Sequence, residues 1–250
     1  MQGCGPSTYG DRWADIYDDW TKQRLGAAVT QAAIDGLAEL ADGGRVLELA
    51  IGTGRIALGL VERGLEVHGL DASEEMVARL RAKPGGEDLP VTIGDFADVG
   101  VDGRFDVVFV AFNTFFALTT QDDQIRCFEN VARHLTDDGV FAIEAFLPDP
   151  ARFDRDQTLR TMQVTTDLVD LEASTHDAVS QTVSVQRVVI SARETTLRPV
   201  HLRYAWPSEL DLMARLAGLA LRQRWAGWDR AAFTGSSAAH VSVYGHRRPV

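Results

Sequence analysis

A glycine-rich turn stands where a short apolar run passes into an amphipathic helical pattern. The run VLELA at 46–50 leads through Ile51 into Gly52-Thr53-Gly54, and RIALGL follows at 55–60. Glycines at such a strand-to-helix turn let the backbone approach a ligand closely. The turn also matches the dinucleotide pattern GxGxxA. By itself it is equally consistent with a nucleotide-type ligand and with a merely tight turn.

Three acidic residues accompany the predicted strands on the same rim of a sheet. Glu48 lies within the first strand, Asp71 ends the second and Asp95 ends the third. A buried carboxylate such as Glu48 has little use unless it organises the loop or meets a cationic ligand group. An acid at the position of Asp71 can accept hydrogen bonds from ribose hydroxyls. Each acid alone is more readily a turn or capping residue, but the three together indicate a nucleotide-type site.

Short apolar runs alternate with amphipathic helices around these residues, which is typical of parallel strands joined by crossover helices. Ser73 is expected to cap one helix, and Thr120 with Asp123 to cap the next. The strands that we predict are 46–50, 66–70, 90–94, 105–112 and 139–146.

Both flanks of this α/β region differ from it in pattern. Residues 11–41 read as helical, whereas 159–205 is rich in β-branched residues without helical crossovers, which favours an antiparallel insertion. A last helix is expected to begin at Trp206-Pro207-Ser208, with Asp211 in capping-box position, and to end at Gly218. The predicted organisation is an N-terminal helical lid at 1–42, a core at 43–150 and 206–250, and an antiparallel insertion at 151–205.

Composition narrows the classes of partner. A net charge of -11 and a pI near 5.0 disfavour a protein that binds nucleic-acid phosphates. Cys4 and Cys127 have neither metal-ligand nor disulfide-framework spacing, so we expect no metal and a reducing cytoplasm. No apolar run is long enough for a membrane span. We therefore expect a small-molecule partner, no nucleic acid and no membrane, with self-association through exposed insertion strands giving a homo-oligomer.

Successive motifs of the core resemble those of class I S-adenosylmethionine-dependent methyltransferases. They are E-L-A-I-G-T-G at 48–54, G-L-D-A-S at 69–73, G-D-F at 94–96 and F-D-V-V-F-V at 105–110. The resemblance implies an α/β, Rossmann-like seven-stranded sheet with helices on both faces and its last strand antiparallel. It also implies S-adenosylmethionine as cofactor and S-adenosylhomocysteine as product. Ala50 departs from the pattern, because the family often has a glycine there.

The resemblance also implies roles for individual residues. The loop at 50–54 would hold the methionyl part, Asp71 the ribose, Ala72 an adenine face, and Asp95 with Phe96 the adenine edge. Tyr17-Asp18 followed by Arg24 resembles antibiotic-tailoring and deoxysugar N-methyltransferases, where such a pair grips the cofactor carboxylate; otherwise Tyr17 packs the lid and Arg24 is solvated. The implied cofactor-binding residues are Tyr17, Arg24, Glu48, Ala50, Gly52, Gly54, Asp71, Ala72, Met76, Asp95, Phe96 and Ala111.

Methyl transfer needs an aligned acceptor with an exposed lone pair more than it needs acid-base machinery. The segment after the fourth strand lacks the Asn/Asp-Pro-Pro-aromatic signature of enzymes that methylate base or glutamine amides. The tail at 202–219 is similar to lincosamide-type N-methyltransferases of actinobacterial secondary metabolism. We predict Tyr9 as a catalytic phenol folded over an amine; the alternative is that it only anchors the terminus. The predicted substrate-binding residues are Asn113, Phe115, Phe116 and His201. The alternative for the two phenylalanines is a place in the core, and for His201 a place in solvent.

The expected function is N-methylation of a small natural product as an antibiotic tailoring step, with an oxygen acceptor or a glycine-like amine as the alternatives. A nicotinamide-dependent oxidoreductase would also fit the glycine turn and Asp71. None of the tyrosines begins the Tyr-x-x-x-Lys dyad of short-chain hydride-transfer enzymes, which weakens that reading. A catalytically silent cofactor-binding protein is a third interpretation.

Overall fold

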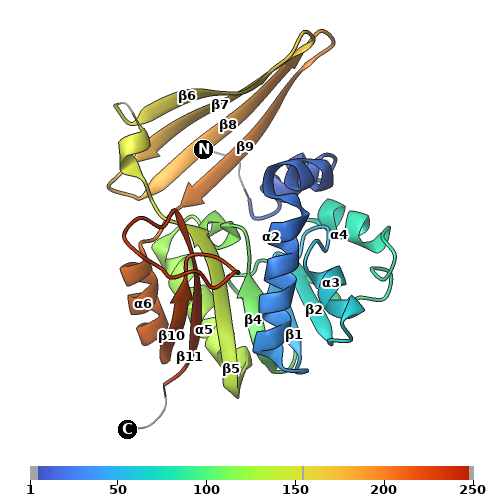
Figure 1. Ribbon diagram of the computed structural model, residues 1–250, viewed down its shortest axis with the longest axis vertical. Coiled ribbons are helices and arrows are strands. Elements are labelled where there is room, and N and C mark those ends of the chain that lie inside the picture. The colour runs from blue at the N-terminus through green and yellow to red at the C-terminus, as the bar shows by residue number, and fades with distance from the viewer. Residues whose placement is uncertain (1–4, 154, 248–250) are drawn as a thin grey trace.

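The core of the molecule is a seven-stranded sheet in the order β10-β11-β5-β4-β1-β2-β3 (Figure 1). The computed structural model describes residues 5–153 and 155–247. The strands are β1 (Val46–Leu49), β2 (Val67–Asp71), β3 (Val91–Ile93), β4 (Phe105–Val110), β5 (Leu135–Phe146), β10 (Leu219–Trp225) and β11 (Ala239–His246). β11 is antiparallel to both β5 and β10, and β1 to β5 form a parallel array. The predicted Rossmann-like sheet is confirmed.

Helices cover both faces of this sheet, and each face has its own hydrophobic cluster. On one face, α5 and α6 contribute Phe128 and Met213 to a cluster with β4 and β5. On the other, α2 and α3 contribute Leu37 and Leu60. The helices are α1 (Thr8–Trp13), α2 (Tyr17–Ala41), α3 (Ala57–Glu62), α4 (Glu74–Arg81), α5 (Gln121–His134) and α6 (Pro207–Leu216), with short 3₁₀ turns η1 (Thr114–Ala117) and η2 (Pro150–Arg152).

Two of the three predicted helix caps are present. Ser73 Oγ accepts from the Met76 N–H at 3.2 Å, and Thr120 Oγ1 accepts from the Asp123 N–H at 3.1 Å. The last helix does begin within Trp206-Pro207-Ser208, at Pro207, whose fixed φ and missing N–H suit a first helical position. The predicted capping box is wrong, because no side chain caps this helix. Asp211 instead pairs with Arg224 at 2.6 Å.

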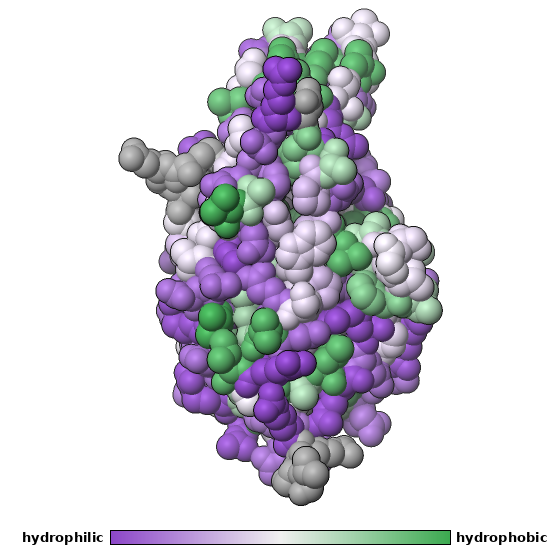
Figure 2. Space-filling model, turned by 90° about the vertical axis from the view of Figure 1, so that its left-hand side faces the viewer, coloured by the Kyte–Doolittle hydropathy of each residue, from purple (hydrophilic) through white to green (hydrophobic). Residues whose placement is uncertain are grey.

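The insertion is an antiparallel sheet of four strands that projects from the upper end of the core (Figure 1). The strands are β6 (Gln157–Val164), β7 (Leu168–Asp177), β8 (Thr182–Ser191) and β9 (Thr195–Arg203). A turn in which the Thr165 N–H donates to the Leu168 carbonyl separates β6 from β7. Figure 2 shows the molecule from the left-hand side of Figure 1, where polar and apolar residues are interspersed over the surface.

The N-terminal helical segment is not continuous. α1 ends at Trp13, and α2 is broken at Gly26, where φ is 74° and ψ is 161°. This conformation is essentially restricted to glycine. Hydrophobic periodicity does not reveal such a break at a single residue, so it predicted one helix over 11–41. From here on, the lid means residues 8–25, which is the part of the predicted segment 1–42 that precedes the break at Gly26. Figure 1 shows this part of the chain between the insertion sheet and the upper end of the core.

Among residues 5–153 and 155–247, no helix combines the length and the apolar character that crossing a bilayer requires.

The break at Gly26 predicts the sign of the stability change that a substitution at this position causes. No atom lies within 4 Å of a Cβ built on Gly26, so Gly26→Ala acts through the backbone alone. We expect the free energy of unfolding to fall by about 1–3 kcal/mol, because alanine is strained at this φ and ψ. In an unbroken helix the same change would instead stabilise by about 0.5–1 kcal/mol. Urea denaturation distinguishes the two, and a gain in stability would contradict the break.

Candidate active site

The glycine loop is held in shape by the carboxylate at the end of β2. Gly52 and Gly54 have φ values of 57° and 77°, and Ala50 adopts 55° despite its side chain. Asp71 Oδ2 accepts from the Gly52 N–H at 2.7 Å, and Oδ1 accepts from the Ser73 N–H at 2.8 Å. Asp71 therefore ties the loop after β1 to the first turn of α4. Each oxygen retains a second lone pair for a ligand hydroxyl.

Glu48 is a buried carboxyl group beside this loop with an unpaired oxygen. Its Oε2 has no hydrogen-bond partner, and desolvation by burial raises its pKa to about 8. The guanidinium of Arg55 and the N–H of Ala57 oppose that shift. An orphaned buried oxygen is expensive unless a donor reaches it. The site is therefore suited to a cationic amino group.

The lid is fastened to the loop by an ionic contact that the sequence reading missed. Asp18 Oδ1 accepts from Thr53 Oγ1 at 2.5 Å, and Asp18 Oδ2 lies 2.7 Å from Lys83 Nζ. Lys83 also donates to the Thr53 carbonyl at 2.8 Å. Asp18 was quoted in the Tyr-Asp motif, but nothing in the sequence linked it to a lysine 65 positions later.

A second contact joins α1 to the N-terminus of α4. Ser73 Oγ donates to Asp11 Oδ1 at 2.7 Å. Gly10 permits this approach, since a Cβ on it would lie only 2.4 Å from the Cβ of Ser73. The predicted cofactor residue Met76 lies here as well, buried in a cluster with Trp13. The Tyr-Gly-Asp sequence at 9–11 was the available signal for this junction.

Aromatic side chains of the lid pack in a continuous series. Tyr9 stacks on Trp13 with centroids 5.5 Å apart and meets Tyr17 edge-on at 6.5 Å. Trp20 lies 5.0 Å from Trp13 and 5.7 Å from Phe112, which follows β4. Phe112 thus meets the lid from the core, although the sequence reading did not select it.

Both lid tyrosines are neutral at physiological pH. Burial is the main reason that the pKa of Tyr17 is raised to about 12, and it raises the pKa of Tyr9 well above its usual value. A phenol in this state can accept or donate a hydrogen bond, whereas a phenolate base is not available at physiological pH.

The cation beside Tyr17 and Glu48 is Arg55, whose charge acts on the pKa of both groups. Arg55 donates to Thr30 Oγ1 at 2.9 Å, and its Cζ lies 5.9 Å from the Phe112 ring centroid. Arg24, predicted to act with Tyr17, is exposed and lies over the Trp20 ring at 5.6 Å. Its charge also acts on Tyr9. The position of Arg55 directly after Gly-Thr-Gly was the signal that the sequence offered.

The segment after β4 does not provide the substrate cavity predicted for it. Phe115 and Phe116 are completely buried in the core cluster, so neither has surface for a ligand, and this prediction is corrected. Asn113 has a φ of 65°, and its Oδ1 accepts from the Phe146 N–H at 2.6 Å. The side-chain oxygen of Asn113 therefore ties the segment after β4 to the end of β5.

The remaining predicted residues divide between the rim of the core sheet and the insertion. Asp95 Oδ1 accepts from the Ala97 N–H at 2.9 Å, and Phe96 is half-buried against the core. Ala72 is half-buried beside Asp71, and Ala111 is buried after β4. His201 lies on β9, where its Nδ1 is 2.8 Å from Ser184 Oγ. The structure thus places His201 on the insertion, apart from the rim.

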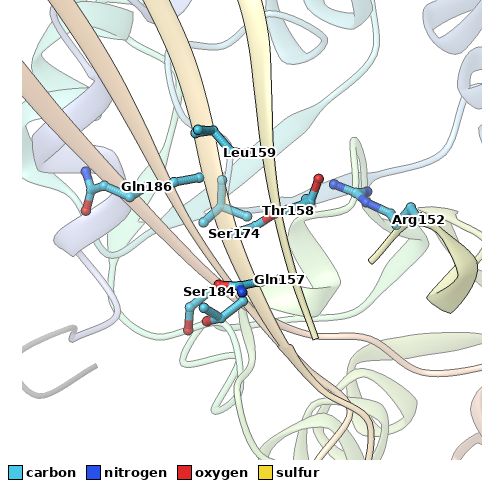
Figure 3. A pocket seen from close by; sticks show the side chains of 10 residues that line it. Arg152, Gln157, Thr158, Leu159, Ser174, Ser184 and Gln186 are labelled. Atoms are coloured by element: carbon cyan, nitrogen blue, oxygen red, sulfur yellow. The ribbon is translucent and has the colours of Figure 1, made fainter. Parts of the chain in front are cut away.

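A hollow of about 800 Å³ opens on the insertion sheet (Figure 3). Ser174 and Ser184 reach it from β7 and β8, and Arg152 comes from η2. None of the residues predicted from the sequence lines it.

Known proteins match this chain over its core and beyond. A family of methyltransferase domains matches residues 46–139. The cypemycin N-terminal methyltransferase of a Streptomyces species is 33% identical over 219 residues, covering 86% of this chain and 87% of the relative. The chain belongs to the S-adenosylmethionine-dependent methyltransferases.

Solved structures agree with this assignment. The CcbJ methyltransferase from Streptomyces caelestis superposes with a TM-score of 0.91 at 40% identity, over 98% of this chain and all of the other. The DesVI protein of Streptomyces venezuelae, at 20% identity and a TM-score of 0.73, shares the fold. Membership of the family excludes the nicotinamide reading of the glycine turn.

The junction at Gly10 yields a prediction for this methyltransferase. In Gly10→Ala the new methyl group collides with Ser73, so α1 must move away from α4 and lose the Asp11 contact. We expect the affinity for S-adenosylhomocysteine to fall about tenfold, because the lid no longer closes on the loop. Calorimetric titration measures this loss. Gly5→Ala is the matched control, since nothing lies within 4 Å of its Cβ; equal affinities of the two variants would refute the junction.

The raised pKa of Glu48 gives a second prediction. At pH 7 the isolated enzyme holds this carboxyl group protonated, because its pKa is about 8. A cationic group bound beside it favours the ionised form. Binding of S-adenosylhomocysteine at pH 7 should therefore release roughly one proton, measured by calorimetry in buffers of different ionisation enthalpy. Glu48→Gln should abolish the release; its persistence in that variant would assign the proton to another group.

The same pKa fixes the sign of a stability effect. Unfolding returns Glu48 to its ordinary value of 4.5, so the wild-type protein loses stability as pH rises from about 5 through 8. Glu48→Gln lacks this loss. The unfolding free energy of the wild-type protein should therefore fall relative to that of Glu48→Gln as pH rises across that window.

Proposed function

We propose that this methyltransferase transfers the methyl group of S-adenosylmethionine to an amine nitrogen of a small natural product, as a tailoring step in antibiotic biosynthesis. The observation that carries the proposal is the pair of neutral phenols in the lid, where Tyr9 meets Tyr17 edge-on and Tyr17 lies beside Arg55. A free amine attacks through its own lone pair and needs no strong base. An alcohol or phenol acceptor needs a base or a metal to ionise it.

Residues of this chain fit the cofactor in a definite order. Glu48, with its unpaired oxygen, suits the amino group, and Arg55 suits the carboxylate. The loop at 50–54 would accommodate the methionyl chain and Asp71 the ribose, while Asp95 and Phe96 would border the adenine. The cofactor supplies an electrophilic methyl group on a sulfonium.

The protein's part in the reaction is alignment and exclusion of water. The lid closes over the loop through Asp18 and Lys83, which limits the access of water. The hydroxyl of Tyr9 is proposed to accept a hydrogen bond from the amine and so orient its lone pair. The nitrogen–carbon bond forms as the sulfur–carbon bond breaks, and the ammonium product then loses its proton to solvent.

The relatives support a nitrogen acceptor. Besides the cypemycin N-terminal methyltransferase, the dTDP-4-amino-2,3,4,6-tetradeoxy-D-glucose N,N-dimethyltransferase of Saccharopolyspora spinosa is 32% identical over 153 residues, covering 57% of this chain and 58% of that enzyme. One name specifies a peptide N-terminus and the other an amino sugar, so the shared chemistry is N-methylation of an amine.

Self-association is part of the proposal. β6 is an edge strand with most of its side chains exposed, including Leu159 and Val164. Such an edge is a ready site for pairing with a second copy. Light scattering that gives the mass of one chain at micromolar concentration would contradict the proposed self-association.

The test of the function uses purified enzyme with S-adenosylmethionine labelled in its methyl group. A panel of amines is compared with the corresponding alcohols, and we expect label to enter the amines alone. Tyr9→Phe should lower the turnover number about 100-fold with little change in the affinity for S-adenosylhomocysteine. Tyr204→Phe, which removes a phenol on the insertion side that lies 2.9 Å from His176 Nε2, is the control. Unchanged turnover in Tyr9→Phe, or labelling of alcohols alone, would overturn the proposal.

A further inference from the structure

One face of the insertion sheet lies against α1 of the lid. The register pairs Glu172 with Arg187 and Arg187 with Arg198, so these three side chains stand in one row on the same face. In the lid, Asp15 pairs with Arg198 at 3.0 Å, and the Trp13 ring centroid lies 5.6 Å from Arg187 Cζ. We call this junction between α1 and the insertion sheet the seam.

Buried polar atoms without partners gather at the seam. They are Trp13 Nε1, Ser174 Oγ, Arg187 Nη1 and Arg198 Nε. Trp13 is 3%, Ser174 4% and Arg198 8% exposed. Ser174 stands one row further along the same face as Arg187 and also lines the hollow of Figure 3. Buried donors rarely lack a partner in folded proteins, and four at one junction point to a ligand.

All four groups can donate hydrogen bonds, and three of them can only donate. The charges of the arginines are already balanced. Asp170 accepts two bonds from Arg187 Nε at 3.0 Å each, and Asp15 pairs with Arg198. A cationic ligand group would meet only hydrogen-bond donors here, without a free carboxylate to balance its charge. The complementary ligand group is an acceptor oxygen of a carboxylate or a carbonyl.

The seam adjoins the residue proposed to orient the amine. Tyr9 stacks on Trp13 on one side and meets Tyr17 on the other. The charge of Arg187 also acts on the pKa of Tyr9. The seam and Tyr9 are therefore close enough for one small molecule to contact both.

We propose that the seam binds the carboxylate or carbonyl oxygen of an amino-acid-derived acceptor, in which that oxygen lies a few bonds from the amine that is methylated. Trp13, Arg198 and Ser174 donate to the oxygen. This inference rests on the proposed function, because it assumes an amine acceptor at Tyr9.

The test compares three small amines of similar shape. Alanine carries a carboxylate, alaninamide a neutral carbonyl, and 2-aminopropane neither. Each is titrated by calorimetry into enzyme already saturated with S-adenosylhomocysteine. We expect alanine and alaninamide to bind at least about tenfold more tightly than 2-aminopropane. Tighter binding of alanine than of alaninamide identifies a carboxylate, and equal binding identifies a carbonyl.

Variants assign any such preference to the seam. Trp13→Phe keeps an aromatic ring, although a smaller one, and removes the N–H, so it should abolish the preference for the two oxygen-bearing amines. Trp228→Phe is the matched control, since Trp228 Nε1 is also buried without a partner but packs against Gly36 of α2. Ser174→Ala should reduce the preference, whereas a purely structural hydroxyl without a partner would leave it unchanged.

A last comparison isolates the ion pair from the unpaired donor. Asp15→Asn removes the charge partner of Arg198 and should keep the preference, whereas Arg198→Met should lose it. Equal binding of the three amines, binding of none at millimolar concentration, or identical behaviour of Trp13→Phe and Trp228→Phe would overturn the inference. Failure of S-adenosylhomocysteine itself to bind would instead refute the proposed function.

Discussion

The carboxylate of Asp71 is the constraint on which the site depends. Its two oxygens accept one N–H from the glycine loop and one from the first turn of α4, so the carboxyl ends of β1 and β2 are held in a fixed relation. The parallel pairing of these two strands brings Asp71 to the loop. Backbone donors are neutral, and both oxygens keep capacity for a ligand. The same group that shapes the loop therefore remains able to bind.

The lid depends on this arrangement. Asp11 contacts Ser73, the cap of α4, and Asp18 contacts Thr53 of the loop, so these two lid acids attach to the two turns that Asp71 joins. Asp18 also pairs with Lys83, and the aromatic series of the lid adds apolar packing to these polar contacts. A closure built from a few polar contacts and one glycine break is suited to opening for ligand exchange.

Strain and an unpaired group are present beside the same loop. Ala50 and Phe112 hold left-handed backbone conformations that cost energy for residues with a side chain, and Glu48 keeps an unpaired oxygen in a buried place. Such exceptions to stability are expected at a binding site, since ligand contacts compensate for them.

The sequence by itself determined the sheet, the glycine loop and the acids at its rim, because these depend on local periodicity, on glycine chemistry and on the ends of parallel strands. It also identified Tyr17 and Tyr9 as residues of the lid. Only the tertiary structure decided that Arg55 lies beside Tyr17, that Phe115 and Phe116 belong to the core, and that the insertion faces α1 with buried donors. These outcomes rest on contacts between elements far apart in the chain, and no local pattern encodes the direction in which such side chains point.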